Sequence, residues 1–214
     1  MVGEGKNKRP LEYLYRLMRP DLEELKPRPH HPMMDCHPES EALRWWVYLF
    51  VDCGSHKGYS SPLVHTSLDM AGVEYWAYQA RQDRGEKKER QVACRIDVWR
   101  WYQSGNLEAH QIIDLSSDRK ACAWYGKHGN GLDNGYEEYS RAISRSSVCK
   151  EVCIKWRNQV PIEYWDVVDD RGNKIATLTE FLAERTERQA AADYSTASSL
   201  SLIHISEPTR RITI

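Results

Sequence analysis

Apolar residues recur at helical spacing through much of the first half of the chain. Leu11, Leu14 and Met18 share one stripe, so the segment 10–18 is predicted to be a helix. The same spacing predicts further helices, over 39–53, 63–73, 74–81, 92–104 and 136–144. The amino-terminal half is therefore expected to be rich in helix.

A different pattern begins in the last third of the chain. Apolar and β-branched residues gather over 148–156 and 164–168, which favours strands. The run 169–173 has the composition of a turn and leads into a third short strand at 174–176. We therefore predict a β-hairpin near 148–176.

A capping box marks the start of one more helix. Thr177 and Glu180 have the spacing of this motif, which predicts a helix over 178–192. Helices followed by a hairpin and a last helix, without regular alternation of strand and helix, indicate an α+β fold. We expect an amino-terminal helix with a Pro/His-rich linker, a single globular α+β domain and a short tail, at 1–38, 39–193 and 194–199.

The last segment, Leu200 to Ile214, is of another kind. Its first part, LSLIHISEPTR, resembles the translation of a transposase-type sequencing adapter in one frame, and the four residues after it fit the codons that follow. The alternative is a short Ser/Thr-rich tail with an incidental apolar run. The resemblance implies that residues 200–214 are non-native and that the natural chain need not end at Ser199. It also implies a reading frame from a metagenome, and hence a phage or other microbial origin.

Charge and cysteine content restrict the partners and the compartment. The chain is 29% charged with a formal net charge of -1, so its overall charge indicates no partner. The chain has eight Trp and twelve Tyr but only two Phe. Trp and Tyr combine a large apolar ring with a polar group, so they are suited to cores that extend to the surface and to surfaces on which nucleic-acid bases stack. Six Cys occur without an apolar leader, and no apolar run approaches the ~20 residues of a membrane helix. We expect a cytoplasmic protein with free thiols and no membrane partner.

A local surplus of positive charge lies between Arg81 and Arg100, where seven basic residues accompany four acidic ones. Residues 95–109, RIDVWRWYQSGNLEA, are similar to the recognition helix and the start of the wing in excisionase-like and mercury-resistance-regulator-like winged-helix proteins. The resemblance implies a helix-turn-helix protein that binds DNA through Arg95 and Arg100, with Trp99 or Trp101 anchoring the helix. The charge surplus adds Lys87, Lys88 and Arg90 as residues that attract the phosphates. The segment Glu86–Gln91 and the acidic Asp97 depart from that family's pattern, and an ordinary amphipathic helix with a glycine cap is the alternative.

Two other functions stay open. A metal-dependent nuclease would use the acids Asp166, Asp169 and Asp170 near Lys174, although turn formation alone accounts for two of these acids. A structural or assembly protein would use exposed aromatic side chains as a contact face.

The spacing of Cys and His predicts no metal site. One Cys/His pair at 36–37 and another at 53 and 56 flank a predicted helix, which would hold them about 20 Å apart. Cys149 and Cys153 lack the two-residue spacing of a zinc knuckle. We therefore expect no metal ligand and no cofactor.

Overall fold

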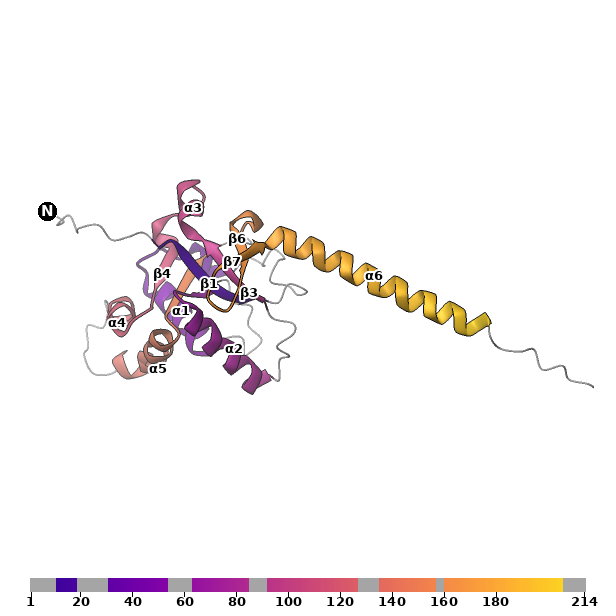
Figure 1. Cartoon of the computed structure of the whole chain (residues 1–214). Helices are drawn as coiled ribbons and strands as arrows, with labels where there is room; N and C mark the ends of the chain where they lie inside the picture. Colours follow the sequence, from indigo (N-terminus) through magenta and orange to yellow (C-terminus); the bar gives the residue numbers. More distant parts are fainter. Residues whose placement is uncertain are drawn as a thin grey trace, which may run out of the picture.

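A seven-stranded sheet forms the centre of the protein, in the order β4-β5-β2-β1-β3-β6-β7 (Figure 1). The computed structural model describes residues 11–18, 31–53, 63–84, 92–126, 135–156 and 160–205. The strands are β1 (Tyr13–Met18), β2 (Leu63–Ser67), β3 (Val92–Asp97), β4 (Ile112–Asp114), β5 (Glu151–Lys155), β6 (Trp165–Val168) and β7 (Lys174–Thr177). All pairings between neighbouring strands are antiparallel.

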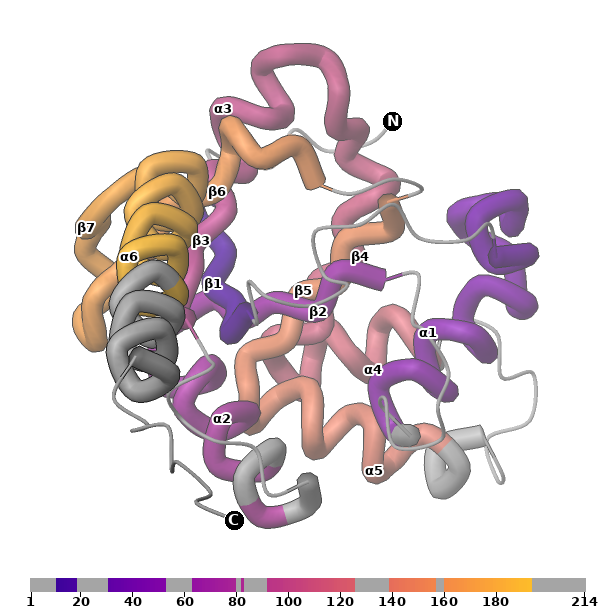
Figure 2. Tube along the Cα trace, turned by 90° about the vertical axis from the view of Figure 1, so that its right-hand side faces the viewer, coloured from indigo at the N-terminus to yellow at the C-terminus, as the bar shows by residue number. Residues whose placement is uncertain are grey.

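The sheet consists of two well-paired halves that meet at a narrow junction. Strand β2 pairs with β5 along its whole length, and β1 does so with β3. Between β1 and β2, the described residues contribute a single register pair, Tyr15 with Ser67. Figure 2 shows β2, β4 and β5 on one side of this junction and β1, β3, β6 and β7 on the other.

Helices cover the sheet in two groups. The α-helices are α1 (Glu41–Cys53), α2 (Met70–Arg84), α3 (Val98–Gln103), α4 (Asp118–Gly126), α5 (Gly135–Val148) and α6 (Leu178–Ile205). Short 3-10 helices are η2 (Pro32–Asp35), η5 (Ala109–Gln111) and η6 (Ile162–Tyr164). Helices α1, α4 and α5 pack together near the β4-β5-β2 half, whereas α6 starts against β6 and β7 and then extends away from the sheet (Figures 1 and 2).

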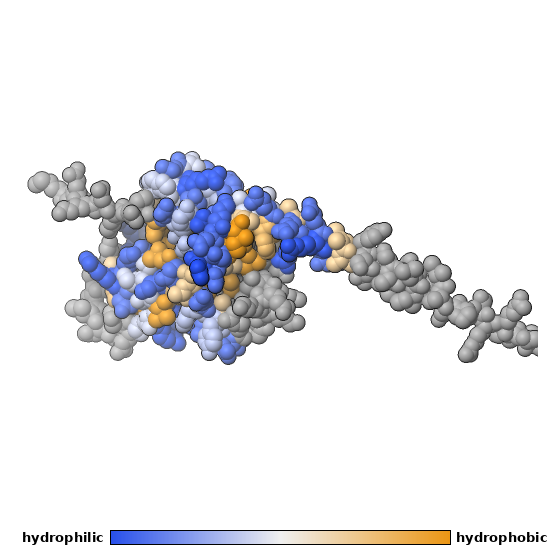
Figure 3. Space-filling view, in the orientation of Figure 1, coloured by the Kyte–Doolittle hydropathy of each residue, from blue (hydrophilic) through white to orange (hydrophobic). Residues whose placement is uncertain are grey.

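Both faces of the sheet are buried, each under its own cluster of apolar side chains. Side chains alternate between the two faces along a strand, so neighbouring residues belong to different clusters. On β2, Val64 belongs to the cluster on one face and Leu63 to the cluster on the other. On one face, Trp101 is fully buried between the rings of Trp156 and Tyr164. The other face packs against α1, α4 and α5. Figure 3 shows apolar surface over β6 and β7 beside the start of α6, where Ile175 is exposed.

The α+β class predicted from the sequence is confirmed, but three of the predicted helices are wrong. The segments 10–18 and 63–73 contain β1 and β2, and the first half of 92–104 is β3, so that strands and helices share the amino-terminal half. The helix over 39–53 is confirmed as α1. Among the described residues, no helix is both long and apolar enough to span a membrane.

The carboxyl-terminal predictions agree better with the structure. Strands β6 and β7 form the predicted hairpin, and the backbone N–H of Asp169 closes its turn by donating to the carbonyl of Asn173. The predicted strand over 148–156 exists as β5, but it pairs with β2 and β4 and takes no part in the hairpin. Helix α6 begins at Leu178, as the capping box predicted, but it runs to Ile205, past the predicted end at residue 192.

Candidate functional site

A buried carboxylate bonded to a histidine lies on one face of the β2–β5 pair. In the register of the two strands, His65 lies opposite Cys153 and Ser67 lies opposite Glu151, so these four side chains share one face. The Nδ1 atom of His65 is 2.6 Å from Oε1 of Glu151. The Glu151 side chain is 0% exposed and that of His65 is 23% exposed, so the imidazole lies between the acid and the surface.

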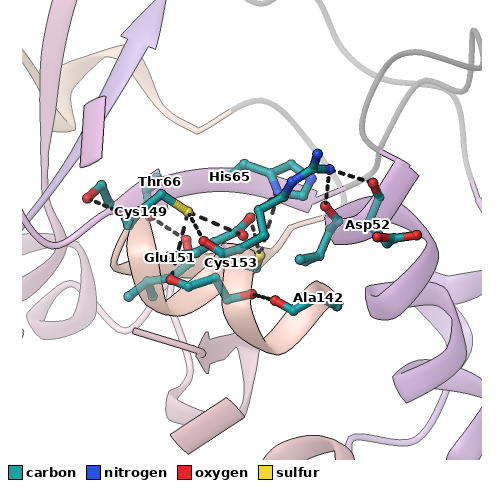
Figure 4. Close-up of polar contacts among 12 residues, drawn as sticks. Asp52, His65, Thr66, Ala142, Cys149, Glu151 and Cys153 are labelled. Carbon is teal, nitrogen blue, oxygen red and sulfur yellow. Dashed lines mark hydrogen bonds and ion pairs between the residues drawn. The ribbon is translucent and has the colours of Figure 1, made fainter. Parts of the chain in front are cut away.

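Two thiols complete the surroundings of the carboxylate. Sγ of Cys153 lies 3.5 Å from Oε1 of Glu151, and Sγ of Cys149 lies 3.9 Å from Oε2 (Figure 4). Burial raises the pKa of both thiols far above the usual value, and the negative charge of Glu151 raises it further. Both sulfurs therefore stay protonated near neutral pH and act as weak donors to the acid.

The turn between α5 and β5 sets the position of Glu151. Lys150, the residue before it, has φ 52°, in the left-handed region that favours glycine. Two bonds to β2 and its end hold this turn: Ser67 Oγ donates to the carbonyl of Cys149 at 2.8 Å, and the N–H of Leu68 donates to the carbonyl of Lys150 at 3.0 Å. An unfavourable backbone conformation beside a buried acid is typical of sites under functional constraint.

The cluster is not a Cys–His–Glu nucleophile. In such triads one ring nitrogen of histidine takes the nucleophile's proton while the other is held by the acid. Here Sγ of Cys153 is 3.6 Å from Nδ1 of His65, the same nitrogen that contacts Glu151. The thiol is also fully buried with a raised pKa, which disfavours the thiolate. Glu151, and not the sulfur, is the chemically distinctive group of this site.

A guanidinium stands at the junction of the two half-sheets. Nη1 of Arg16, on β1, donates to the carbonyl of His65 at 2.7 Å. Its charge partly offsets the effect of burial and of Glu151 on the pKa of Cys153. This cation from one half of the sheet is thus within electrostatic range of the Cys153 thiol in the other half.

A tyrosine hydroxyl lies near the cluster without a hydrogen bond. The ring of Tyr125 stacks on that of Tyr139 at 4.9 Å, and its hydroxyl is buried with no hydrogen-bond partner among the described residues. Burial raises the pKa of this phenol, and the negative charge of Glu151 raises it further. The unpaired hydroxyl is therefore within electrostatic range of the buried acid.

Three of the six residues that the sequence proposed for DNA binding lie in the described part of the chain, on two different elements. Arg95 lies on β3 and not on a helix; it pairs with Asp166 at 3.2 Å and covers the ring of Tyr13. Trp99 and Arg100 lie together on α3 and are exposed. The other three candidates, Lys87, Lys88 and Arg90, lie outside the described residues.

Two of the three acids proposed for a nuclease form ion pairs or hydrogen bonds within the protein. Asp166 forms ion pairs with both Arg95 and Lys174, the latter at 2.7 Å. Asp169 accepts hydrogen bonds from the backbone N–H groups of Arg171 and Asn173, as its place in the turn predicted. Asp170 is exposed in the same turn, and the nuclease role of these acids stays a prediction.

Sequence reasoning did not find His65 or Glu151. The signal available was Glu151, the one acidic residue in the predicted strand segment VCKEVCIKW, since charged residues are rarely fully buried without a partner. Among the described residues, Glu151 is the only carboxylate in the buried class. Comparison of the chain with protein-family models, curated proteins and solved structures gives no match.

Proposed function

We propose that this protein is an enzyme that breaks the N-glycosidic bond of a nicotinamide dinucleotide, with Glu151 as the catalytic carboxylate. The observation that carries the proposal is the fully buried Glu151 carboxylate, which His65 contacts across the β2–β5 pair. A carboxylate away from water stabilises positive charge much more strongly than one in solvent. It therefore favours a reaction whose transition state gains positive charge nearby.

Cleavage of a glycosidic bond is such a reaction. Its transition state resembles an oxocarbenium ion, with positive charge on the sugar carbon and ring oxygen. Enzymes of this kind usually employ two carboxyl groups, one of which protonates the leaving group. Here a single carboxylate is buried in the described part of the chain, so a leaving group that needs no proton fits best.

A pyridinium base meets this requirement. When the C1′–N bond breaks, its electron pair passes to the ring nitrogen, and nicotinamide leaves as a neutral molecule. The cationic sugar carbon then accepts an oxygen lone pair from water or from an acceptor hydroxyl, which loses its proton to solvent. The substrate enters on the partly exposed side of His65, and the imidazole has to turn aside for it to reach Glu151.

Release of nicotinamide from NAD⁺ by the purified protein tests this function. We expect release by the wild type, and a loss of at least about 100-fold in kcat for Glu151→Gln, which keeps the shape but removes the charge. Glu163→Gln is the matched control, because Glu163 is an exposed acid outside the cluster. Equal rates for the two variants, or no release by the wild type at protein concentrations comparable with the substrate, would contradict the proposal.

A second candidate function, binding of nucleic acid, has one observation in its favour. The rings of Trp99 and Tyr102 on α3 are stacked, with centroids 6.1 Å apart and planes at 19°, and they are 37% and 45% exposed. Arg100 lies between them in sequence and is exposed as well. Exposed stacked rings beside a cation are suited to unpaired bases.

Fluorescence anisotropy with labelled single-stranded and duplex DNA tests this second function. Base stacking contributes about 1–3 kcal/mol per aromatic, so Trp99→Ala is expected to weaken binding to the single strand by that amount. Trp45→Ala serves as the control, because Trp45 is 41% exposed on α1. Binding that is unaffected by Trp99→Ala would remove α3 as the contact surface.

A further inference from the structure

Three side chains of the cluster have the donor set of a transition-metal site. His65 offers an imidazole nitrogen, Glu151 a carboxylate oxygen and Cys153 a sulfur, and their ligand atoms all lie within 4.8 Å of one another. Nitrogen, oxygen and sulfur together are typical ligands of Zn²⁺ and Co²⁺, whereas Mg²⁺ and Ca²⁺ prefer oxygen alone. Three protein ligands also leave a fourth tetrahedral position open.

The distances among these atoms can be compared with a tetrahedron. Zinc bonds of about 2.0–2.3 Å imply edges of about 3.6 Å from sulfur to nitrogen or oxygen, and of about 3.4 Å from nitrogen to oxygen. In the structure, Sγ of Cys153 lies 3.6 Å from Nδ1 of His65 and 3.5 Å from Oε1 of Glu151. The third edge, from Nδ1 to Oε1, is 2.6 Å because a hydrogen bond closes it. Two of the three edges therefore already have the required length.

We propose that His65, Glu151 and Cys153 bind one zinc-class ion, and that this ion excludes the substrate of the proposed function by occupying Glu151. Binding requires the third edge to open by about 0.8 Å. The ion replaces the thiol proton of Cys153, which passes to solvent, while the ring proton of His65 moves from Nδ1 to Nε2. The metal site itself does not depend on the proposed function, because binding is measured without a substrate.

Direct metal titration of the full chain tests the site. The protein is stripped with a chelator, titrated with Co²⁺, and monitored through the near-ultraviolet band of a cobalt–thiolate bond; bound Zn²⁺ is measured by elemental analysis after gel filtration. We expect one ion per chain. Residues that only support a ligand already contribute about 10–100-fold to metal affinity, so Cys153→Ala and His65→Gln are expected to weaken binding by at least about 100-fold.

Two cysteine variants separate this site from adventitious thiol binding. Cys36→Ser and Cys122→Ser alter half-buried thiols away from the cluster and are expected to keep both the band and the stoichiometry. Cys153→Ser provides a second, more conservative variant should Cys153→Ala lower stability. A cobalt–thiolate band that persists in both Cys153 variants, or the absence of a bound ion in the wild type, would overturn the metal site.

Nicotinamide release with and without Zn²⁺ then separates the two proposals. Inhibition of the wild type at the Zn²⁺ concentration that fills the site supports both. Metal binding without any nicotinamide release supports the metal site and overturns the proposed function. If nicotinamide release depends on Glu151 but the protein binds no Zn²⁺, only the metal site is overturned.

Discussion

His65 and Glu151 form a contact of 2.6 Å between two adjacent strands, although 86 positions separate them in the sequence. The bond runs diagonally across the β2–β5 ladder, because each residue lies directly opposite a different partner. The pair is thus held by the register of two strands, and its geometry depends on the sheet as a whole.

Loss of the imidazole should destabilise the protein more than loss of the charge it contacts. His65→Ala leaves a buried carboxylate without its strongest donor, and we expect the free energy of unfolding to fall by about 3 kcal/mol. Glu151→Gln keeps an acceptor for His65 and should cost about 1 kcal/mol. Urea unfolding of both single variants and of the double variant gives the interaction energy of the pair.

The control for this cycle is an exposed pair of the same type. His110 lies 3.0 Å from Glu108, and both side chains face solvent. His110→Ala should change the free energy of unfolding by less than about 1 kcal/mol. A cost equal to that of His65→Ala would show that burial of Glu151 does not determine the effect.

Gly72 permits the close approach of α2 to the turn that carries Glu151. A Cβ at this position would lie 2.1 Å from both the carbonyl oxygen of Cys149 and Oγ of Ser67. We therefore expect Gly72→Ala to destabilise the protein by about 3 kcal/mol, the upper part of the range for overpacking. Adding Ser67→Ala should recover only part of this loss, because the Cys149 contact is with backbone.

Gly105 gives the comparison for this substitution. It has φ +75°, and a Cβ at this position would meet no atom within 4 Å, so Gly105→Ala costs only the strain of the left-handed backbone, about 1 kcal/mol. Thermal unfolding of the two variants side by side measures the difference. Equal melting temperatures would contradict the predicted clash at Gly72.

Stability should fall at alkaline pH because of the two buried thiols. Folding raises the pKa of Cys149 and Cys153 above the ordinary value of 9.0, so the folded state holds these protons more tightly than the unfolded state. The stabilisation is complete below pH 9 and is lost as pH rises above it, by up to about 1.4 kcal/mol per pH unit and per thiol. Urea unfolding under reducing conditions between about pH 7 and 10.5 measures this slope.

Removal of one thiol provides the check on that slope. Cys153→Ala should unfold with a shallower pH dependence than the wild type, whereas Cys122→Ser should follow the wild type. Burial also raises the pKa of the Tyr125 phenol. This group therefore lowers the free energy of unfolding further at higher pH, in all three proteins. An unchanged slope in Cys153→Ala would exclude its thiol as a cause.

The capping box at the start of α6 should contribute measurably to stability. The N–H of Glu180 donates to Oγ1 of Thr177 at 3.2 Å, and the N–H of Thr177 donates to Oε2 of Glu180 at 2.8 Å. Thr177→Ala removes the first bond and should cost about 1 kcal/mol. Thr177→Ser keeps the hydroxyl and should be close to the wild type in urea unfolding.

Local chemistry was predictable from the sequence, and long-range pairing was not. The β6–β7 turn and the capping box depend on residues within five positions of one another, so their side-chain types suffice to identify them. The sequence predicts a helix in place of strand β1 because Leu14 and Met18, both buried, are four residues apart. That spacing fits one face of a strand as well as one face of a helix.

The candidate site escaped prediction for the same reason. His65 stood in a segment predicted to be helical, and nothing near it in the sequence points to Glu151. The Cys149 and Cys153 spacing argued against a zinc knuckle, and it carried no information on a histidine from another strand. Only the antiparallel register of β2 and β5 brings the three types of side chain together.

The single register pair between β1 and β2 also affects how the molecule opens. Few backbone hydrogen bonds cross this line, so a local fluctuation that parts the two halves costs less than one that breaks either half. Such an opening would leave the carboxylate and the imidazole together, since both belong to the β2–β5 pair, while Arg16 moves with β1. We therefore expect the sheet to open first along the line between its two halves, with the cation on one side and the anion on the other. Amide hydrogen exchange should be faster along it than within either half.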